Sequence, residues 1–94
     1  MSVALAQIKT AHASRYLQQL CKHWSHKYPV EFTPEKGRIE MSAGVLLLEA
    51  APETLDLNLT TAEEDLVRME GVVAAHLQRF AFKEELVFDW TPEA

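Results

Sequence analysis

The strict alternation of leucines with polar residues over residues 54–60 sets the strongest limit on the fold. Three leucines fall on one side of this segment and three polar residues on the other: Leu55, Leu57 and Leu59 against Asp56, Asn58 and Thr60. Successive side chains of a strand point to opposite faces, so one face is predicted to be buried and the other to contact water. A strand of this kind is typical of an antiparallel sheet that is covered on one face only.

Similar but shorter patterns predict five more strands and two helices. The strands are expected over residues 3–9, 30–33, 38–41, 45–50 and 86–90, and the helices over about 10–27 and 61–82. Turns of hairpin length join the four middle strands, which predicts an antiparallel meander. The chain has 94 residues, enough for one domain. We therefore predict a single domain over residues 1–94, an α+β two-layer sandwich of order β-α-β-β-β-β-α-β with both helices on one face of the sheet.

Local signals predict how the helices and turns begin and end. Thr10 is expected to cap the first helix, and Thr61 with Glu64 to form a capping box at the start of the second. Gly37 is expected to end a turn over residues 34–37, where a glycine is free to take a positive φ angle. Gly71 lies inside the second helix at a cost in helix propensity, and we attribute it to the close approach of another backbone.

Charge, hydropathy and cysteine content narrow the class of protein. A net charge of −5 disfavours a general nucleic-acid binder, because such proteins gain affinity by neutralising phosphates. The longest apolar run, residues 45–48, is far shorter than the ~20 residues of a membrane span, and we find no signal peptide. The one cysteine, Cys21, has no partner for an internal disulfide, which predicts a cytoplasmic protein.

The first helix carries two stripes of side chains on a helical wheel. The stripe expected to face the core consists of Ala13, Leu17, Leu20 and Trp24, with Tyr16 and Cys21 at its borders. The second stripe consists of His12, Arg15, Gln19, His23 and His26. Neutral imidazoles are suitable ligands for zinc, copper and iron(II), so His12, His23 and His26 are candidate metal ligands. The alternative is a solvated helix face whose imidazoles bond to backbone carbonyls.

A fourth histidine, His76, lies at the edge of the apolar stripe of the second helix. It is either a half-buried imidazole with one satisfied nitrogen or part of a pocket shared with the first helix, and its distance from His23 decides between these. A guanidinium beside imidazoles can hold a carboxylate or a phosphate. We therefore name four candidate residues for binding a cofactor: Arg15, Tyr16, His76 and Arg79. Cys21 is expected to be a small core residue and not a nucleophile.

Several motifs resemble those of one bacterial family, domain of unknown function 2218. They are Thr10-Ala11, Arg15-Tyr16-Leu17, Gln19-Leu20-Cys21-Lys22-His23, His26-Lys27, Gly37-Arg38-Ile39, Gly44 and His76-Leu77-Gln78-Arg79-Phe80-Ala81-Phe82-Lys83-Glu84. The resemblance covers nearly the whole chain and implies an α+β fold similar to that of the TATA-binding protein. DNA binding does not follow from that fold. Similar segments occur fused to siderophore-interacting, flavin-dependent ferric reductases, which implies by association a link to iron handling.

Three classes of function stay open at this point. The first is a small binding module that holds a metal ion, haem or a ferric chelate on the histidine face. The second is a protein-interaction module, either a homodimer or a partner of a reductase, because residues 45–50 are apolar on both faces. The third is an enzyme using the histidines as acid and base with Arg15 as anion clamp. We place the enzyme last, since no catalytic constellation stands out in the sequence.

Overall fold

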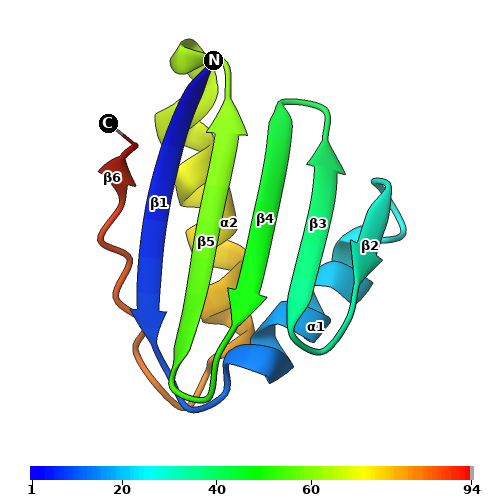
Figure 1. The fold of residues 1–94 in the computed structure, drawn as a ribbon, viewed down its shortest axis with the longest axis vertical. Coiled ribbons are helices and arrows are strands. Elements are labelled where there is room, and N and C mark those ends of the chain that lie inside the picture. Colours follow the sequence, from blue (N-terminus) through cyan, green and yellow to red (C-terminus); the bar gives the residue numbers. More distant parts are fainter. Residues whose placement is uncertain (94) are drawn as a thin grey trace.

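The fold is an antiparallel sheet with two helices packed on one of its faces (Figure 1). A computed structural model describes residues 1–93, so the last residue of the predicted domain, residue 94, lies outside the described residues. The strands are β1 (Ser2–Lys9), β2 (Val30–Phe32), β3 (Lys36–Met41), β4 (Gly44–Ala50), β5 (Thr54–Thr61) and β6 (Thr91–Pro92). The helices are α1 (Ala13–Trp24), the short 3₁₀ helix η1 (Glu63–Asp65) and α2 (Leu66–Phe80).

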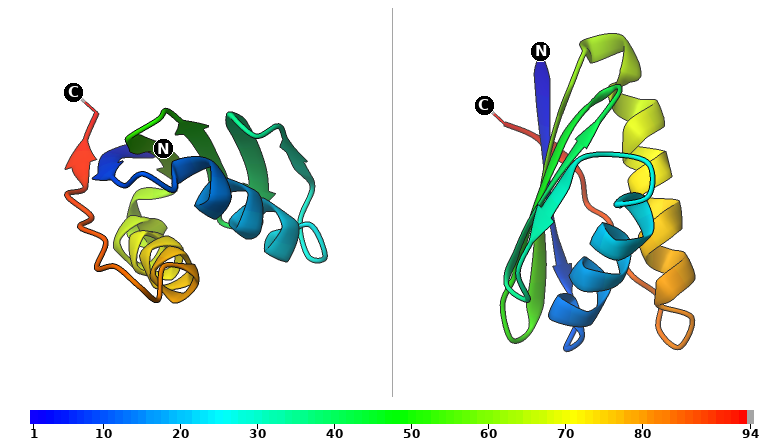
Figure 2. Two further views of the ribbon diagram at one scale, coloured as in Figure 1. Left: turned by 90° about the horizontal axis from the view of Figure 1, so that it is seen from below. Right: turned by 90° about the vertical axis from the view of Figure 1, so that its right-hand side faces the viewer.

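The sheet is antiparallel throughout, with strand order β2-β3-β4-β5-β1-β6. The four middle strands β2 to β5 form the predicted meander, and β1 then pairs with β5 along its whole length. Figure 2 shows α1 and α2 on the same side of the sheet, and no element formed by residues 1–93 covers the opposite side. The predicted two-layer α+β sandwich is therefore confirmed.

The core lies between the helices and the sheet, and it contains the residues that the patterns selected. The three leucines of β5 are at most 2% exposed, as their alternation predicts. The α1 stripe predicted to face the core is buried throughout, including both of its bordering residues. On α2 the buried residues recur at helical spacing: Met69, Val73 and Leu77. The sequence patterns thus predicted the inner face of each layer.

The glycines have different roles from those predicted. No glycine takes a positive φ among residues 1–93, and β3 already begins at Lys36, so the prediction that Gly37 ends a turn is wrong. Gly37 lies inside β3 and faces α1, where an added Cβ would come 2.8 Å from the sulfur of Cys21. This glycine lets the helix approach the sheet closely. The explanation for Gly71 is also wrong, since a Cβ there would have no neighbour within 4 Å.

The predicted caps do not form as expected. The Thr10 hydroxyl accepts a hydrogen bond from the amide of His12, which precedes α1 and is not part of its first turn. Thr61 is the last residue of β5 and is fully buried, and its hydroxyl donates to the carbonyl of Ala62. Because its side chain is committed to the core, Thr61 makes no capping box with Glu64, and η1 leads into α2 instead.

The helix ends and the last strand also differ from the prediction. The two helices end at Trp24 and Phe80, a few residues earlier than expected. Residues 86–90 are not a strand, although Leu86 is buried and Phe88 and Trp90 pack against the core. The alternation of these apolar residues therefore reflects their packing against the core, and their backbone forms no strand ladder. The chain joins the sheet only at β6, which pairs with β1.

Candidate functional site

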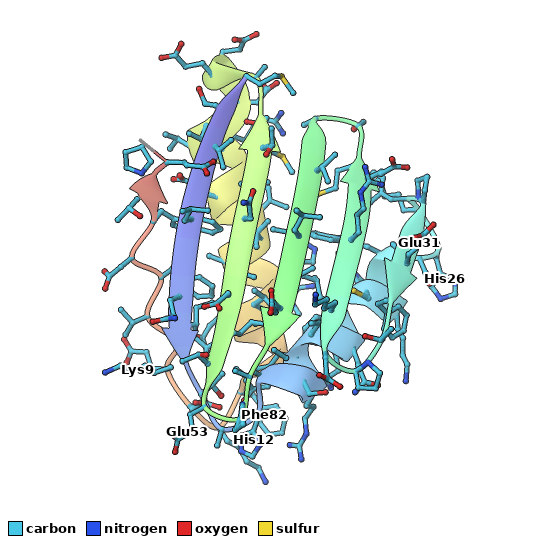
Figure 3. All side chains as sticks on the ribbon, viewed as in Figure 1. Lys9, His12, His26, Glu31, Glu53 and Phe82 are labelled. Carbon is cyan, nitrogen blue, oxygen red and sulfur yellow. The ribbon has the colours of Figure 1, made fainter. Side chains whose placement is uncertain are left out.

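The three candidate metal ligands of the first helix lie at different places. His12 precedes α1, His23 is in its last turn, and His26 follows it. At 1.5 Å per residue, His12 and His23 are roughly 16 Å apart along the helix axis. Figure 3 places His12 at one end of the molecule and His26 at the edge of the sheet beside β2. Within residues 1–93 no group of three or more His, Cys, Asp or Glu side chains is arranged to hold a metal ion.

The structure brings His23 together with His76 of the other helix. Their ring centres are 5.5 Å apart and the rings are tilted by 44°. Two aromatic side chains pack against the pair. The ring centre of the buried Trp24 is 4.9 Å from that of His76, and the ring centre of Phe80 is 6.0 Å from that of His23. The packing of α1 against α2 therefore forms a histidine pair that neither helix contains alone. We call His23 and His76 the interhelical pair.

One hydrogen bond fixes the orientation of His76. Its Nδ1 lies 2.7 Å from the carbonyl oxygen of Val72, one turn earlier on α2. A carbonyl only accepts, so Nδ1 carries the hydrogen and Nε2 of the neutral ring keeps a free lone pair. Metal-binding histidines typically donate their second nitrogen to a carbonyl or carboxylate in this way. His76 is half-buried and His23 is exposed, so the pair is open to solvent on one side.

Tyr16 belongs to a different cluster, at the other end of α1. Its hydroxyl donates to Oε2 of Glu84 at 2.5 Å, and the Thr10 hydroxyl donates to the same oxygen at 3.0 Å. The bond from Tyr16 is the main cause that lowers the pKa of Glu84, with smaller contributions from Thr10 and His12. Burial, followed by the bond to Glu84, raises the pKa of Tyr16. The cluster joins the connection between β1 and α1, α1 itself and the segment after α2.

The remaining candidate residues have simpler surroundings. Arg79 is exposed in the last turn of α2, three residues after His76 and therefore on the same side of the helix. Arg15 is exposed near the Tyr16 cluster, about 12 Å along α1 from His23. Burial raises the pKa of the Cys21 thiol to about 11, which agrees with its predicted place in the core. A neutral buried thiol is a poor nucleophile.

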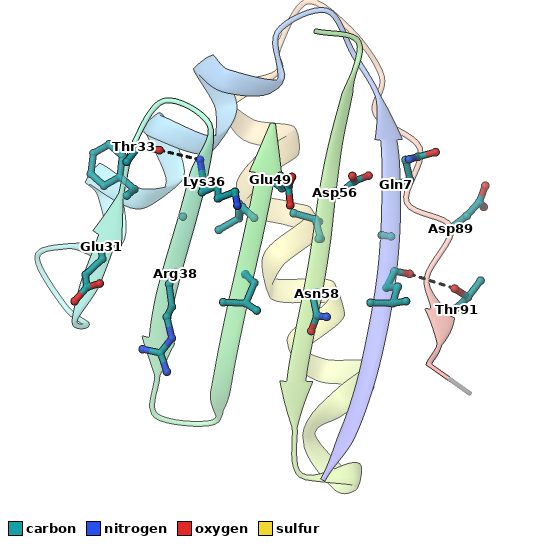
Figure 4. Close-up of a pocket in the computed structure, with 17 residues that line it drawn as sticks. Gln7, Glu31, Thr33, Lys36, Arg38, Glu49, Asp56, Asn58, Asp89 and Thr91 are labelled. Atoms are coloured by element: carbon teal, nitrogen blue, oxygen red, sulfur yellow. Dashed lines mark hydrogen bonds between the residues drawn. The ribbon is translucent and has the colours of Figure 1, made fainter. Parts of the chain in front are cut away.

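The face of the sheet opposite the helices carries a broad, open hollow of about 1020 Å³ (Figure 4). A charged and polar row crosses it in strand register: Lys36, Glu49, Asp56 and Gln7. The next row is more apolar, with Leu47 between Arg38 and Asn58. Leu47 is 42% exposed, so β4 has apolar side chains on both faces, as its sequence predicted.

Among the helices formed by residues 1–93, none has the length and apolar character needed to cross a bilayer.

Comparisons with known proteins place the chain in a family. Residues 5–91 match the family described as an uncharacterized protein conserved in bacteria, DUF2218. The fold is similar to the NMR structure of PA4090 from Pseudomonas aeruginosa, with a TM-score of 0.81 and 42% sequence identity over 98% of this chain and 97% of that chain. No curated protein gives a significant match. Because the matched region covers nearly the whole chain, the protein belongs to the bacterial DUF2218 family.

Proposed function

We propose that this protein is a small metal-binding module in which His23 and His76 bind one divalent transition-metal ion. The observation that supports this most directly is the 5.5 Å distance between their ring centres. Two imidazoles on one tetrahedral ion, with metal–nitrogen bonds of about 2.0 Å, have ring centres roughly 5 Å apart. The pair therefore needs little movement to share an ion. The bond from His76 to Val72 already presents the correct tautomer.

Two protein ligands define what kind of metal site this is. A structural zinc site uses four protein ligands and a catalytic zinc site three. The interhelical pair leaves two or more positions for water or for donor atoms of a small chelate. Arg79, on the same side of α2 as His76, supplies a positive charge for an anionic chelate or a haem propionate. We therefore propose exchangeable binding, suited to holding and releasing a metal. Among the possible metals, we propose iron as the physiological one, because segments similar to this chain occur fused to ferric reductases.

The test is titration of the metal-free protein with copper(II), nickel(II), zinc(II), iron(II) and haemin, followed by calorimetry and absorption spectra. Imidazole sites generally prefer copper(II) among divalent ions, so copper is expected to bind tightest. His23→Ala and His76→Phe each remove one of the two protein ligands. Each should weaken binding by at least about tenfold, because losing even an outer-shell partner of a ligand typically costs 10–100-fold in affinity. The phenylalanine keeps the packing against Trp24.

His26→Ala is the matched control, because His26 is an exposed histidine that follows the same helix and lies outside the pair. It should leave the affinity unchanged. Equal losses in all three variants would show that the metal binds to surface histidines in general and would overturn the proposal. Undiminished binding in the His23→Ala variant would overturn it as well.

Self-association is a second candidate function, favoured by Leu47. This residue is 42% exposed on the sheet face that the helices leave open. A second copy of the chain placed face to face, with the two-fold axis passing near Leu47, would bury Leu47 against its own counterpart. Light scattering at micromolar concentration should then give twice the mass of one chain, and Leu47→Ser should return the monomer. A monomer in the unchanged protein would remove this candidate.

A further inference from the structure

A second hollow, of about 290 Å³, lies between the start of α1 and the segment that follows α2. Its lining combines aromatic rings, cations and one carboxylate: Ala11, His12, Arg15, Tyr16, Phe80, Phe82, Lys83 and Glu84. Figure 3 shows His12 and Phe82 together at this end of the molecule. Arg15 and His23 are about 12 Å apart along α1. The hollow contains neither histidine of the interhelical pair, although Phe80 lines the hollow and also lies against His23. We call it the Glu84 hollow.

The carboxylate of Glu84 is held in place through one of its two oxygens. Oε2 accepts the hydrogen bonds of Tyr16 and Thr10, whereas Oε1 accepts none from the part of the chain that is described. The ion pairs of residues 1–93 do not involve Glu84 either. An oriented carboxylate with a free oxygen is a natural acceptor for an ammonium group.

The Gln78 side chain holds the backbone of the segment after α2 independently of the Glu84 carboxylate. The Gln78 side-chain amide donates to the carbonyls of Ala81 and Glu84, at 3.0 and 2.8 Å. Its oxygen accepts from the amide of Leu86 at 2.8 Å. Three bonds therefore fix the backbone around Glu84. The Glu84 carboxylate is oriented separately, by its bonds to Tyr16 and Thr10.

Cations and aromatic rings surround this carboxylate. Arg15 and Lys83 form no ion pair within residues 1–93. Phe82 is 81% exposed, and the Lys83 ammonium lies 5.7 Å from the centre of its ring. Together with the half-buried Phe80, this ring forms an apolar wall beside opposite charges. Ligand sites are typically concave and combine aromatic side chains with a few polar groups, as this hollow does.

We propose that the Glu84 hollow binds a small zwitterion, a molecule with an ammonium group, a carboxylate and an apolar body, as an apolar amino acid has. Oε1 of Glu84 accepts from the ammonium group. The Arg15 guanidinium pairs with the carboxylate, for which its planar shape is suited. Phe80 and Phe82 contact the apolar body. The volume of about 290 Å³ is at the lower end of the range for ligand sites, which suits a molecule of this size.

The test compares three probes with the same phenyl ring and different charged groups. L-phenylalanine has an ammonium group and a carboxylate, 3-phenylpropionate has only the carboxylate, and 2-phenylethylamine has only the ammonium group. Each is titrated into the whole protein, with binding followed by calorimetry and by NMR shifts of the residues that line the hollow. L-phenylalanine should bind at least tenfold more tightly than either single-charge probe. Equal binding of 3-phenylpropionate would mean a plain anion site and would overturn the proposal. Absence of binding by L-phenylalanine at 10-fold molar excess over ~1 mM protein would do the same.

Two variants separate the roles of the charges. Glu84→Gln keeps an acceptor for Tyr16 and Thr10, so the fold is retained, and it should weaken L-phenylalanine and 2-phenylethylamine binding at least tenfold. It should leave the affinity for 3-phenylpropionate unchanged. Arg15→Gln should instead weaken the binding of 3-phenylpropionate and leave the affinity for 2-phenylethylamine unchanged. Glu85→Gln and Lys27→Gln are matched controls at exposed positions outside the hollow. Full binding in the Glu84→Gln variant would overturn the proposal.

Discussion

The imidazole rings of His23 and His76 lie 5.5 Å apart on two different helices. The distance depends on how α1 and α2 pack on the sheet, because each ring projects from the helix surface towards the other helix. The buried Trp24, adjacent to His23 in the chain, contacts the His76 ring and links the pair to the core. The pair is therefore tied to the folded state, and a ligand that binds both rings should stabilise that state.

The first prediction is that metal binding raises the stability of the protein. An ion present at 100 times its dissociation constant should raise the free energy of unfolding by about 2.7 kcal/mol. Protons compete with the metal for imidazole nitrogen, so the gain should be smaller in acidic solution. Thermal unfolding with zinc or with a chelator, at pH 7.5 and at pH 5.5, measures both effects. A gain of equal size in the His23→Ala variant would contradict the prediction.

The second prediction concerns the bond between Tyr16 and Glu84. Tyr16→Phe removes the donor and leaves the ring in place, and it should lower the free energy of unfolding by about 1–3 kcal/mol. Chemical denaturation at pH 7 measures this loss. Tyr28→Phe, on a half-buried tyrosine outside the cluster, is the control and should have a much smaller effect.

The pH dependence of this loss follows from the two pKa shifts. The folded pKa of Glu84 is below the ordinary value of 4.5, so the stabilisation is present above that value and is lost as the pH falls through the lowered folded pKa. The folded pKa of Tyr16 is above 10.0, so its contribution is present below that pH and lost above it. The difference between Tyr16→Phe and the unchanged protein should thus be largest between about pH 5 and 9 and shrink on either side. A difference that stays constant down to pH 2 would contradict the assignment.

The fold was predictable wherever one residue pattern decides between two faces. The leucines of β5 and the core stripe of α1 predict which side of each element is buried, and burial then requires two layers. The prediction of a strand over residues 86–90 was wrong, because alternating apolar residues indicate which side chains are packed and not which groups the backbone bonds to. There the Leu86 amide bonds to the side chain of Gln78 instead of a strand.

The candidate sites were predictable only in part, for a related reason. A helical wheel places residues on one helix, so it grouped His12, His23 and His26, which the structure separates along α1 and beyond it. The contact between His23 and His76 depends on the packing of two helices, which no local pattern encodes. Glu84 was missed as a site residue because it follows α2 in an irregular segment. Its bonds to Tyr16 and Thr10 arise only in the folded chain.

The third prediction contrasts the glycines at positions 37 and 71. Gly37→Ala places a Cβ 2.8 Å from the Cys21 sulfur and 3.4 Å from Leu17 and Leu48, so overpacking should cost about 1–3 kcal/mol. Gly71→Ala meets no atom within 4 Å and should instead raise stability by about 0.5–1 kcal/mol through helix propensity. Urea denaturation of the two variants measures both changes. A Cys21→Ala change should relieve part of the cost at position 37 but have no effect on the gain at position 71.

The last prediction is that Gln78 is a main support of the chain after α2. Its side chain satisfies the carbonyls of Ala81 and Glu84 and the amide of Leu86. Gln78→Ala removes all three bonds and leaves partly buried backbone groups without partners, so it should cost about 2–4 kcal/mol. Gln18→Ala, a partly buried glutamine on α1 with one bond to Ser14, is the matched control and should cost less than about 1 kcal/mol. Hydrogen exchange should localise the effect, because the Leu86 amide loses its protection in Gln78→Ala while the amides of β4 and β5 keep theirs. Protection of Leu86 equal to that of the unchanged protein would mean that the packing of Leu86, Phe88 and Trp90 holds this segment without the bonds.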